Sequence, residues 1–394
     1  MRATTVATHV CALAALAYAA RTAGFARTWT RVPVVRDVPD APLVSVVVPA
    51  RDEERSIAAC IDSLLAQSAA AIEVIAVDDR SQDATLAILT GIAARDARLT
   101  VVPGDELPEG WVGKPWAAHQ GAARARGRWL LFTDADSVHA PWSVTSALAF
   151  ARARDADAVS IGTLQDLGTL GERAVLPSIL GMIFFVLGPF GALNDPARVG
   201  KALANGQYLF VSRAAYDALG GHAALRDRIV EDIAFARRLK RDGRFRLIMA
   251  AGEDLARVRM YRSFREIWSG FTKNIYYGPE GNVAALAAGV VFLSSISCVP
   301  PLLAVDAARQ RRWCDALEAL ACSAATMASA GWAFHCVRLD RRLGWFQPVG
   351  TAVMAAITIN SAFAVLTGRG VAWRGRTYRG RAGGEIRAGR CAQR

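Results

Sequence analysis

The stretch that decides the fold is Arg128-Trp129-Leu130-Leu131-Phe132-Thr133-Asp134-Ala135-Asp136-Ser137. Its apolar run has the length of a buried strand, and carboxylates follow where that strand ends. Where an extended segment breaks into a turn, acids at positions i and i+2 can converge on one point. Aspartate oxygens are hard ligands that suit Mg²⁺ or Mn²⁺, so Asp134 and Asp136 are candidate metal ligands. An Asp-rich turn that caps a helix is the alternative interpretation.

The composition of the chain indicates a membrane protein rather than a soluble one. Hydrophobic residues make up 53% of the 394 residues, which is above the average for soluble domains. The net charge of +12 lies largely in short stretches beside apolar runs, which favours anionic lipid over nucleic acid as its partner. The 7 cysteines form no C-x-x-C pair, so neither a zinc site nor a disulfide framework is indicated.

The first apolar stretch, residues 3–20, is barely long enough to span a bilayer. Arginines follow it, which predicts an uncleaved anchor over residues 1–21 with the succeeding domain in the cytoplasm. A signal peptide cleaved at Ala17-Tyr18-Ala19 is the alternative.

From Leu43 the pattern changes to that of an α/β domain. Strand-like runs at 44–50, 73–77, 99–102 and before Asp134 alternate with helical stretches at 56–67, 81–94 and 116–125. Ser81 has the residue type of a helix N-cap. Such alternation predicts a mainly parallel sheet, whose ligands gather at the carboxyl ends of the strands. The acids at such ends are Asp52, Asp79, Asp134 and Asp136.

Motifs in this segment resemble, in order and spacing, the nucleotide-sugar motifs of family 2 glycosyltransferases. They are Val-Ser-Val-Val-Val-Pro-Ala-Arg-Asp-Glu (44–53), Val-Asp-Asp-Arg-Ser-Gln-Asp (77–83), Gly-Lys-Pro-Trp-Ala (113–117) and Thr-Asp-Ala-Asp (133–136). The resemblance covers about residues 43 to 275 and implies a GT-A nucleotide-sugar-binding fold with a divalent cation, Mg²⁺ or Mn²⁺, and a UDP-linked donor.

The same resemblance implies roles for individual residues. The base and ribose would be held by Pro49, Ala50, Arg51, Glu53 and Asp79. Asp134 and Asp136 would hold the metal and the diphosphate, and Lys114 would lie near the nucleotide. A solvated loop residue is the alternative interpretation of Lys114.

A second acidic pair, Glu231-Asp232, precedes a predicted helix at 233–241. Acids at a helix start are ordinary dipole partners, and that position biases a carboxylate toward its charged form. In family 2 enzymes a Glu-Asp pair at this distance after Asp-x-Asp carries the catalytic base, so the resemblance maps this role onto Asp232, with Glu231 as the alternative. A base there implies direct displacement with inversion at the sugar carbon.

An apolar segment at 174–193 interrupts this domain and is itself broken by prolines and glycines. We expect it to lie in the membrane plane or re-enter beside the acceptor site, with a buried core helix as the alternative. Residues 261–274 lack the Gln-x-x-Arg-Trp motif of processive relatives, which weakens a polymer-synthase assignment. The alternative interpretation of residues 261–274 is an amphipathic helix on the membrane surface.

Three further apolar segments, near 284–305, 316–337 and 346–367, have the length of membrane spans. The arginine-rich tail after them favours the cytoplasm, yet three crossings from a cytoplasmic domain would leave it outside. We expect the first segment, with Pro300-Pro301, to be a half-span.

The tail contains Ala372-Trp373-Arg374-Gly375-Arg376-Thr377-Tyr378, which resembles the C-terminal motif of the ceramide glucosyltransferase branch and of hopanoid-associated bacterial glycosyltransferases. On the cytoplasmic side its arginines could reach the diphosphate. A basic anchor for anionic lipid is the alternative.

The sequence thus predicts an anchor at 1–21, a GT-A domain at 40–282, membrane helices at 283–368 and a basic tail at 369–394. The expected function is that of an inverting, metal-dependent glycosyltransferase in the cell inner membrane, multi-pass, with its catalytic domain in the cytoplasm. It would move a sugar from a nucleotide donor to a hopanoid, carotenoid or sphingolipid-like acceptor, with no nucleic acid partner. The alternatives are a polyprenyl-phosphate sugar transferase and a catalytically silent membrane scaffold.

Overall fold

The computed structural model of the protein describes residues 3–68, 70–278, 282–380 and 387–390. The chain divides into two compact units. The sheet unit comprises residues 30–166, 190–260 and 370–394, and the helical unit comprises residues 1–29, 167–189 and 261–369. Parts of the predicted basic tail, 381–386 and 391–394 with Cys391, lie outside the described residues. The functional boundaries expected from the sequence stay a prediction.

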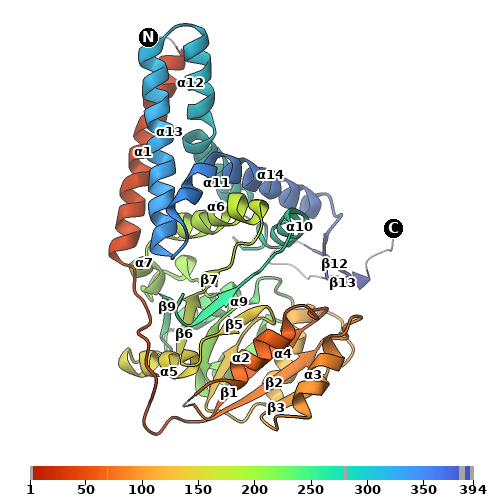
Figure 1. Ribbon diagram of the computed structural model, residues 1–394. Coiled ribbons are helices and arrows are strands. Elements are labelled where there is room, and N and C mark those ends of the chain that lie inside the picture. Colours follow the sequence, from red (N-terminus) through yellow and green to blue (C-terminus); the bar gives the residue numbers. More distant parts are fainter. Residues whose placement is uncertain (1–2, 69, 279–281, 381–386, 391–394) are drawn as a thin grey trace. The chain divides into compact units, whose positions relative to one another are not determined.

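The sheet unit is built on a seven-stranded sheet in the order β3-β2-β1-β4-β8-β6-β9 (Figure 1). Its strands are β1 (Val44–Ala50), β2 (Ile72–Asp78), β3 (Leu99–Pro103), β4 (Trp129–Phe132), β6 (Ala158–Gly162), β8 (Leu209–Ser212) and β9 (Leu247–Ala251). All neighbours pair in parallel except those of β8, which runs antiparallel to β4 and β6. The predicted α/β class with a mainly parallel sheet is confirmed.

The β-branched run of β1 is explained by burial on both faces of the sheet. Val46 and Val48 pack into one hydrophobic core, whereas Val47 packs into a second core on the other face. Helices cover both faces of a parallel sheet, so its inner strands carry apolar residues at every position.

The helices of the sheet unit are α2 (Ile57–Leu65), α3 (Thr85–Ala93), α4 (Gly113–Arg124), α5 (Ser143–Ala153), α7 (Phe190–Asn194), α8 (Arg213–Ala218) and α9 (Glu231–Asp242). From β1 the chain moves outward through β2 to β3 and then returns to place β4 on the other side of β1. The strand order therefore reverses between β1 and β4. In open α/β sheets ligands bind at the carboxyl ends of the strands beside such a reversal.

Two helix starts differ from those expected. Helix α3 begins at Thr85 rather than after Ser81, because the Ser81 hydroxyl accepts a hydrogen bond from the Asp52 backbone (3.0 Å) instead of capping a helix. Helix α4 begins at Gly113, so Lys114 lies in its first turn and not in a loop. Pro115 is compatible with this start because a proline in the first helical turn removes no intrahelical hydrogen bond.

Two smaller three-stranded sheets complete this unit. One contains β5 (Ser137–His139), β10 (Ala256–Val258) and β7 (Leu164–Gln165). The other contains β11 (Val371–Trp373), β12 (Arg376–Arg379) and β13 (Arg387–Arg390), which pair as an antiparallel meander.

The helical unit contains α1 (Ala3–Arg27), α6 (Leu170–Leu187), α10 (Phe264–Asn274), α11 (Val283–Ser297), α12 (Val299–Arg309), α13 (Trp313–Cys336) and α14 (Gln347–Leu366). Helix α13 packs along both α1 and α12, and α6 packs along α14 (Figure 1). Val175, Leu176 and Ile179 of α6 are buried. An in-plane position of this segment in the membrane stays a prediction.

Among the described helices, 2 are long and apolar enough to cross a membrane, Thr5–Phe25 and Arg341–Leu366. Helices α11 and α12 meet at a bend of 42°, so they form either a broken span or a re-entrant loop. The bend lies beside Pro300-Pro301, where the sequence predicts a half-span. Helix α13 is not among the candidates, and its first turns carry Asp315 and Glu318, so the span expected at 316–337 is not supported.

Candidate functional site

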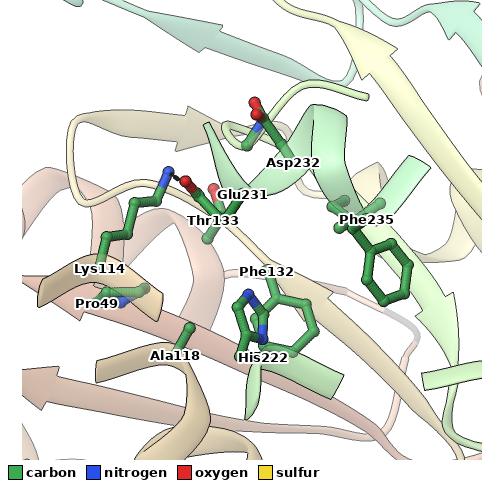
Figure 2. A pocket seen from close by; sticks show the side chains of 11 residues that line it. Pro49, Lys114, Ala118, Phe132, Thr133, His222, Glu231, Asp232 and Phe235 are labelled. Carbon is green, nitrogen blue, oxygen red and sulfur yellow. Dashed lines mark hydrogen bonds and ion pairs between the residues drawn. The ribbon is translucent and has the colours of Figure 1, made fainter. Parts of the chain in front are cut away.

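The residues predicted for the donor meet at the carboxyl ends of β1 and β2. Ala50 ends β1, and its carbonyl accepts a hydrogen bond from the Asp79 backbone (2.7 Å). Arg51 reaches across to donate to the Asp79 carbonyl (2.5 Å). Pro49, the residue before Ala50, lines the pocket that Figure 2 shows. The strand ends therefore bring Pro49, Ala50, Arg51 and Asp79 together as the parallel topology predicts.

A second group, the lysine–acid cluster, consists of Lys114, Asp134, Glu231 and Asp232. Lys114, Glu231 and Asp232 line the same pocket (Figure 2). The Lys114 ammonium lies 2.7 Å from Asp134 Oδ1 and 2.8 Å from Glu231 Oε1. One cation thus joins the acids after β4 to the acids that open α9. Lys114 lies in the first turn of α4 beside the metal-ligand candidate Asp134 rather than in a loop, and its expected position near the nucleotide stays a prediction.

The charged groups of the lysine–acid cluster shift one another's pKa values. Burial lowers the pKa of the Lys114 ammonium, but Asp134, Glu231 and Asp232 outweigh burial and raise that pKa well above its ordinary value. Burial raises the pKa of Glu231, yet the facing Lys114 charge outweighs it and leaves that pKa lowered. Lys114 and Glu231 therefore form a stable ion pair.

Asp232 has the opposite perturbation. Burial, followed by the charge of Glu231, raises the pKa of Asp232 to about 6. Loss of water therefore outweighs the bias toward the charged form that a helix N-terminus exerts. A carboxyl group with this pKa is deprotonated at neutral pH and is a better proton acceptor than an ordinary aspartate.

The position of Asp232 is fixed by backbone donors. Its Oδ2 accepts from the Gly206 N–H and its Oδ1 from the Ile233 N–H, both at 2.8 Å. A Cβ on residue 206 would lie 2.8 Å from Lys114 Nζ and 3.2 Å from Asp232 Oδ2. A side chain at position 206 would therefore require the Lys114 ammonium group to move.

Asp136 has a buried carboxylate oxygen, Oδ1, without a hydrogen-bond partner among the described residues. Burial, then the charges of Asp134 and Glu53, hold the pKa of Asp136 well above its ordinary value. Within the part of the chain that the structure describes, no three His, Cys, Asp or Glu side chains form a complete ion site. Asp134 and Asp136 therefore fit a cation that takes its other ligands from water and phosphate, as Mg²⁺ commonly does.

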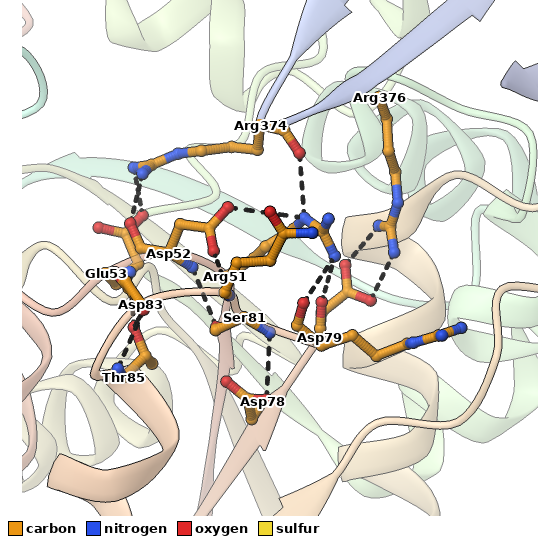
Figure 3. Close-up of polar contacts among 12 residues, drawn as sticks. Arg51, Asp52, Glu53, Asp78, Asp79, Ser81, Asp83, Thr85, Arg374 and Arg376 are labelled. Carbon is orange, nitrogen blue, oxygen red and sulfur yellow. Dashed lines mark hydrogen bonds and ion pairs between the residues drawn. The ribbon is translucent and has the colours of Figure 1, made fainter. Parts of the chain in front are cut away.

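A third group, the arginine–acid cluster, consists of Arg51, Asp52, Glu53, Asp79, Arg374 and Arg376 (Figure 3). Arg374 contacts Glu53 Oε1 at 2.6 Å, and Arg376 contacts Asp79 Oδ1 at 2.9 Å and Oδ2 at 2.5 Å. These arginines come from the C-terminal hairpin, more than 290 residues away in sequence. The contacts of Glu53 and Asp79 with this hairpin are not apparent from the strand pattern.

A buried polar network that includes Thr133 of the pocket is not apparent from the sequence. Thr133 Oγ1 donates to the Gln207 carbonyl (2.8 Å) and lies 3.0 Å from His139 Nε2, while Thr163 donates to Gln207 Oε1 (2.6 Å). Residues 205–207 form a loop before β8 rather than part of a strand. The polar run Asn205-Gly206-Gln207 ahead of an apolar strand is the signal that could have identified this loop.

Comparisons with known proteins identify relatives of this chain. Residues 45–192 match the model of the family described as glycosyl transferase family 2. A 4,4'-diaponeurosporenoate glycosyltransferase of Staphylococcus haemolyticus is 24% identical over 261 residues, which are 65% of this chain and 67% of that protein. Its counterpart in Staphylococcus aureus strain MRSA252 is 26% identical over 63% of this chain and 64% of its own length.

Among solved structures, the mannosyltransferase PcManGT from Pyrobaculum calidifontis, in complex with GDP-Man and Mn²⁺, is similar to this chain. The match has a TM-score of 0.55 and 19% identity, and it covers 92% of this chain and 97% of that one. This likeness concerns the fold.

Proposed function

The chain is a glycosyltransferase that carries a glycosyltransferase family 2 domain on a GT-A fold, and from this premise we propose that it is an inverting, metal-dependent enzyme that transfers a sugar from a nucleotide donor to a lipid acceptor. The observation that supports this most is the lysine–acid cluster, in which Asp134 is joined through Lys114 to Glu231 beside Asp232, at a pocket that Lys114, Glu231 and Asp232 line. A silent scaffold would have no need for ionised side chains with such perturbed pKa values.

For the donor, we propose that Asp79 and the end of β1 hold the nucleoside and that Asp134 and Asp136 hold a divalent cation. The buried, unpartnered Oδ1 of Asp136 supports a cation at this point. A bound Mg²⁺ or Mn²⁺ would stabilise the charge that develops on the diphosphate as the sugar leaves. The complex of the mannosyltransferase with GDP-Man and Mn²⁺ supports a nucleotide sugar and a cation, and we propose UDP as the nucleotide.

For the acceptor, we propose a lipid with an attacking hydroxyl group. The carotenoid named in the staphylococcal relatives supports a lipid, and the two candidate spans support a membrane-bound acceptor. That named carotenoid is a carboxylate, which is already ionised at neutral pH and needs no base. Asp232, with its raised pKa, is suited to deprotonating a hydroxyl as it attacks, and Glu231 is the less suitable base because Lys114 holds it charged.

For the membrane topology, we propose an N-terminal span and an even number of crossings between residues 260 and 370. The chain leaves the sheet unit at Met260 and re-enters it at Gly370, and one compact unit lies on one side of a membrane. The half-span and two full crossings expected from the sequence satisfy this rule, but the crossing expected at 316–337 is not supported, so Arg341–Leu366 would be paired with one further crossing. Basic residues after the first span favour a cytoplasmic sheet unit at the inner membrane.

A reporter fused after Asn282 should give a cytoplasmic signal, and a periplasmic signal would contradict this orientation.

Lipid profiling of a deletion strain tests the proposed function. We expect a glycolipid to be absent from the deletion strain, its unglycosylated precursor to accumulate, and the chain expressed in trans to restore the product. Complementation with Asp242→Asn should restore it equally, because Asp242 lies at the end of α9 opposite Asp232, where it pairs with the exposed Arg244. An unchanged lipid profile with loss of a polysaccharide, or of a polyprenyl-phosphate sugar, would contradict the proposed acceptor.

A further inference from the structure

The turn of the C-terminal hairpin has an unusual backbone for its sequence. Trp373 pairs with Arg376 across the β11–β12 hairpin, which leaves Arg374-Gly375 as a two-residue loop. Both loop residues have positive φ angles, +47° at Arg374 and +74° at Gly375. Hairpin loops of this kind favour Asn, Asp or Gly at the first position, and a non-glycine residue with positive φ is uncommon. Arg374 therefore occupies a position that is unfavourable for arginine in an isolated hairpin.

Contacts of Arg374 with the loop after β1 compensate for this conformation. The guanidinium donates to the Asp52 carbonyl (2.5 Å) and to Glu53 Oε1 (2.6 Å), and the Arg374 carbonyl accepts from Arg51 Nε (3.0 Å) (Figure 3). Asp52, the residue contacted, also has a positive φ of +54°. Residues in strained backbone conformations cluster at active sites and ligand clamps.

Arg376 makes the corresponding contact with the end of β2. It bonds both oxygens of Asp79, and the side chains are only 13% and 7% exposed. Its guanidinium crosses directly over Gly113, where a Cβ would collide with it. Tyr378 on the same hairpin is hydrogen-bonded to the Gly113 backbone, next to Lys114. The hairpin thus contacts the ends of β1 and β2 and the start of α4.

We propose that the β11–β12 hairpin is a wall of the donor site and that Arg374 and Arg376 are positioning residues for nucleoside diphosphate binding. This proposal rests on the proposed function. Glu53 and Asp79 would repel the anionic diphosphate unless their charges were balanced, and the two arginines supply that balance at short range. Their bonds also hold each carboxylate in one orientation toward the nucleoside.

The third arginine of the hairpin, Arg379, differs from the other two in its exposure to solvent. Arg379, at the end of β12, is exposed, whereas Arg374 and Arg376 are partly buried against acids. An anionic lipid surface would bind exposed arginines, so the anchoring role considered for this tail suits Arg379 and not the two paired residues.

The test uses the full chain in detergent or nanodiscs, with UDP and GDP, each plus Mn²⁺, as binding probes. Loss of a charge-assisted bidentate contact in Arg376→Gln should weaken nucleoside diphosphate binding by about 10- to 100-fold. The KM for the donor should rise by the same factor while kcat changes little. Arg376→Lys should restore binding only in part, because an ammonium group cannot bond both Asp79 oxygens. The control Arg379→Gln should change binding by less than about twofold, as exposed charges contribute little.

The outcomes separate this proposal from the proposed function. A wild-type chain that binds neither nucleotide would overturn both. A wild-type chain that binds, with Arg376→Gln binding as tightly or more tightly, would overturn the hairpin proposal alone. If Arg376→Gln fails to fold, Arg374→Gln gives the same test, because its side chain is 35% exposed and its removal leaves the Asp79 pair intact. A fall in kcat of about 10- to 100-fold with no change in the donor KM would also contradict a positioning role.

Discussion

Replacing Asp232 by Asn should lower turnover by about 10² to 10⁴, the usual contribution of a general base, while donor affinity is retained. The change removes the proton acceptor but leaves an amide that can still accept from the Ile233 backbone. The matched control is Asp242→Asn, the same change at the other end of α9, which should keep full activity. The measurements are kcat with saturating lipid acceptor and the dissociation constant of the nucleoside diphosphate.

The pH dependence provides a second readout of the same prediction. The base form of Asp232 is present above its pKa of about 6 and is lost as the pH falls through that value, so kcat/KM should decline below about pH 6. An unperturbed aspartate would place this decline near pH 4. Glu231→Gln removes the neighbouring charge that raises this pKa and should move the decline to lower pH. If Asp232→Asn abolished nucleotide binding with no separate effect on turnover, Asp232 would instead belong to the donor site.

The second large effect is expected from replacing Asp134 and Asp136 together by Asn. This double variant should lose metal-dependent binding of the nucleoside diphosphate, because both carboxylate charges are gone and a neutral amide oxygen binds a divalent cation more weakly than the buried Asp136 carboxylate. Removing residues that only orient a metal ligand lowers metal affinity by about 10- to 100-fold. Removing the metal ligands themselves should lower metal affinity further. Binding is measured with Mn²⁺ and again with excess chelator.

The control for this variant is Asp62→Asn with Asp96→Asn, which removes the same formal charge from residues outside the two clusters. This control should show the same difference in nucleoside diphosphate affinity between Mn²⁺ and chelator as the unmodified chain. Residual chelator-insensitive binding by the double variant is compatible with the account, because Lys114 is freed from Asp134 and can contact phosphate. Equal nucleotide affinity with and without chelator in the unmodified chain would rule out the metal.

Much of the sheet could be predicted because its strands are buried on both faces. Val44–Ala50 and Ile72–Asp78 carry apolar residues on both faces, and the positions of Asp79 and Asp134 follow from the rule that parallel strands end at one edge. The proximity of Lys114 to Asp134 could be inferred only through the family resemblance. Its place in the first turn of α4 depends on a helix start that local propensity placed at residue 116.

The remaining features depend on contacts between distant segments. Nothing near Arg376 in the sequence indicates that it pairs with Asp79, 297 residues away. Ser81 has the chemistry of a helix cap, but its hydroxyl is taken by the Asp52 backbone, which no local pattern reveals. The raised pKa of Asp232 likewise arises from burial and from Glu231, whereas the sequence shows only a helix start. In each case a tertiary contact overrides a correct local preference.

The central claim is inverting, metal-dependent transfer of a sugar from a nucleotide to a lipid. The most direct measurement combines the purified full chain, labelled nucleotide sugar, Mn²⁺ and membrane lipid extract, with the anomeric configuration of the extracted product determined by NMR. The account predicts label in a chloroform-soluble glycolipid, with configuration opposite to that of the donor and with no product in the presence of chelator. A product of retained configuration, or transfer that continues without the metal, would contradict it.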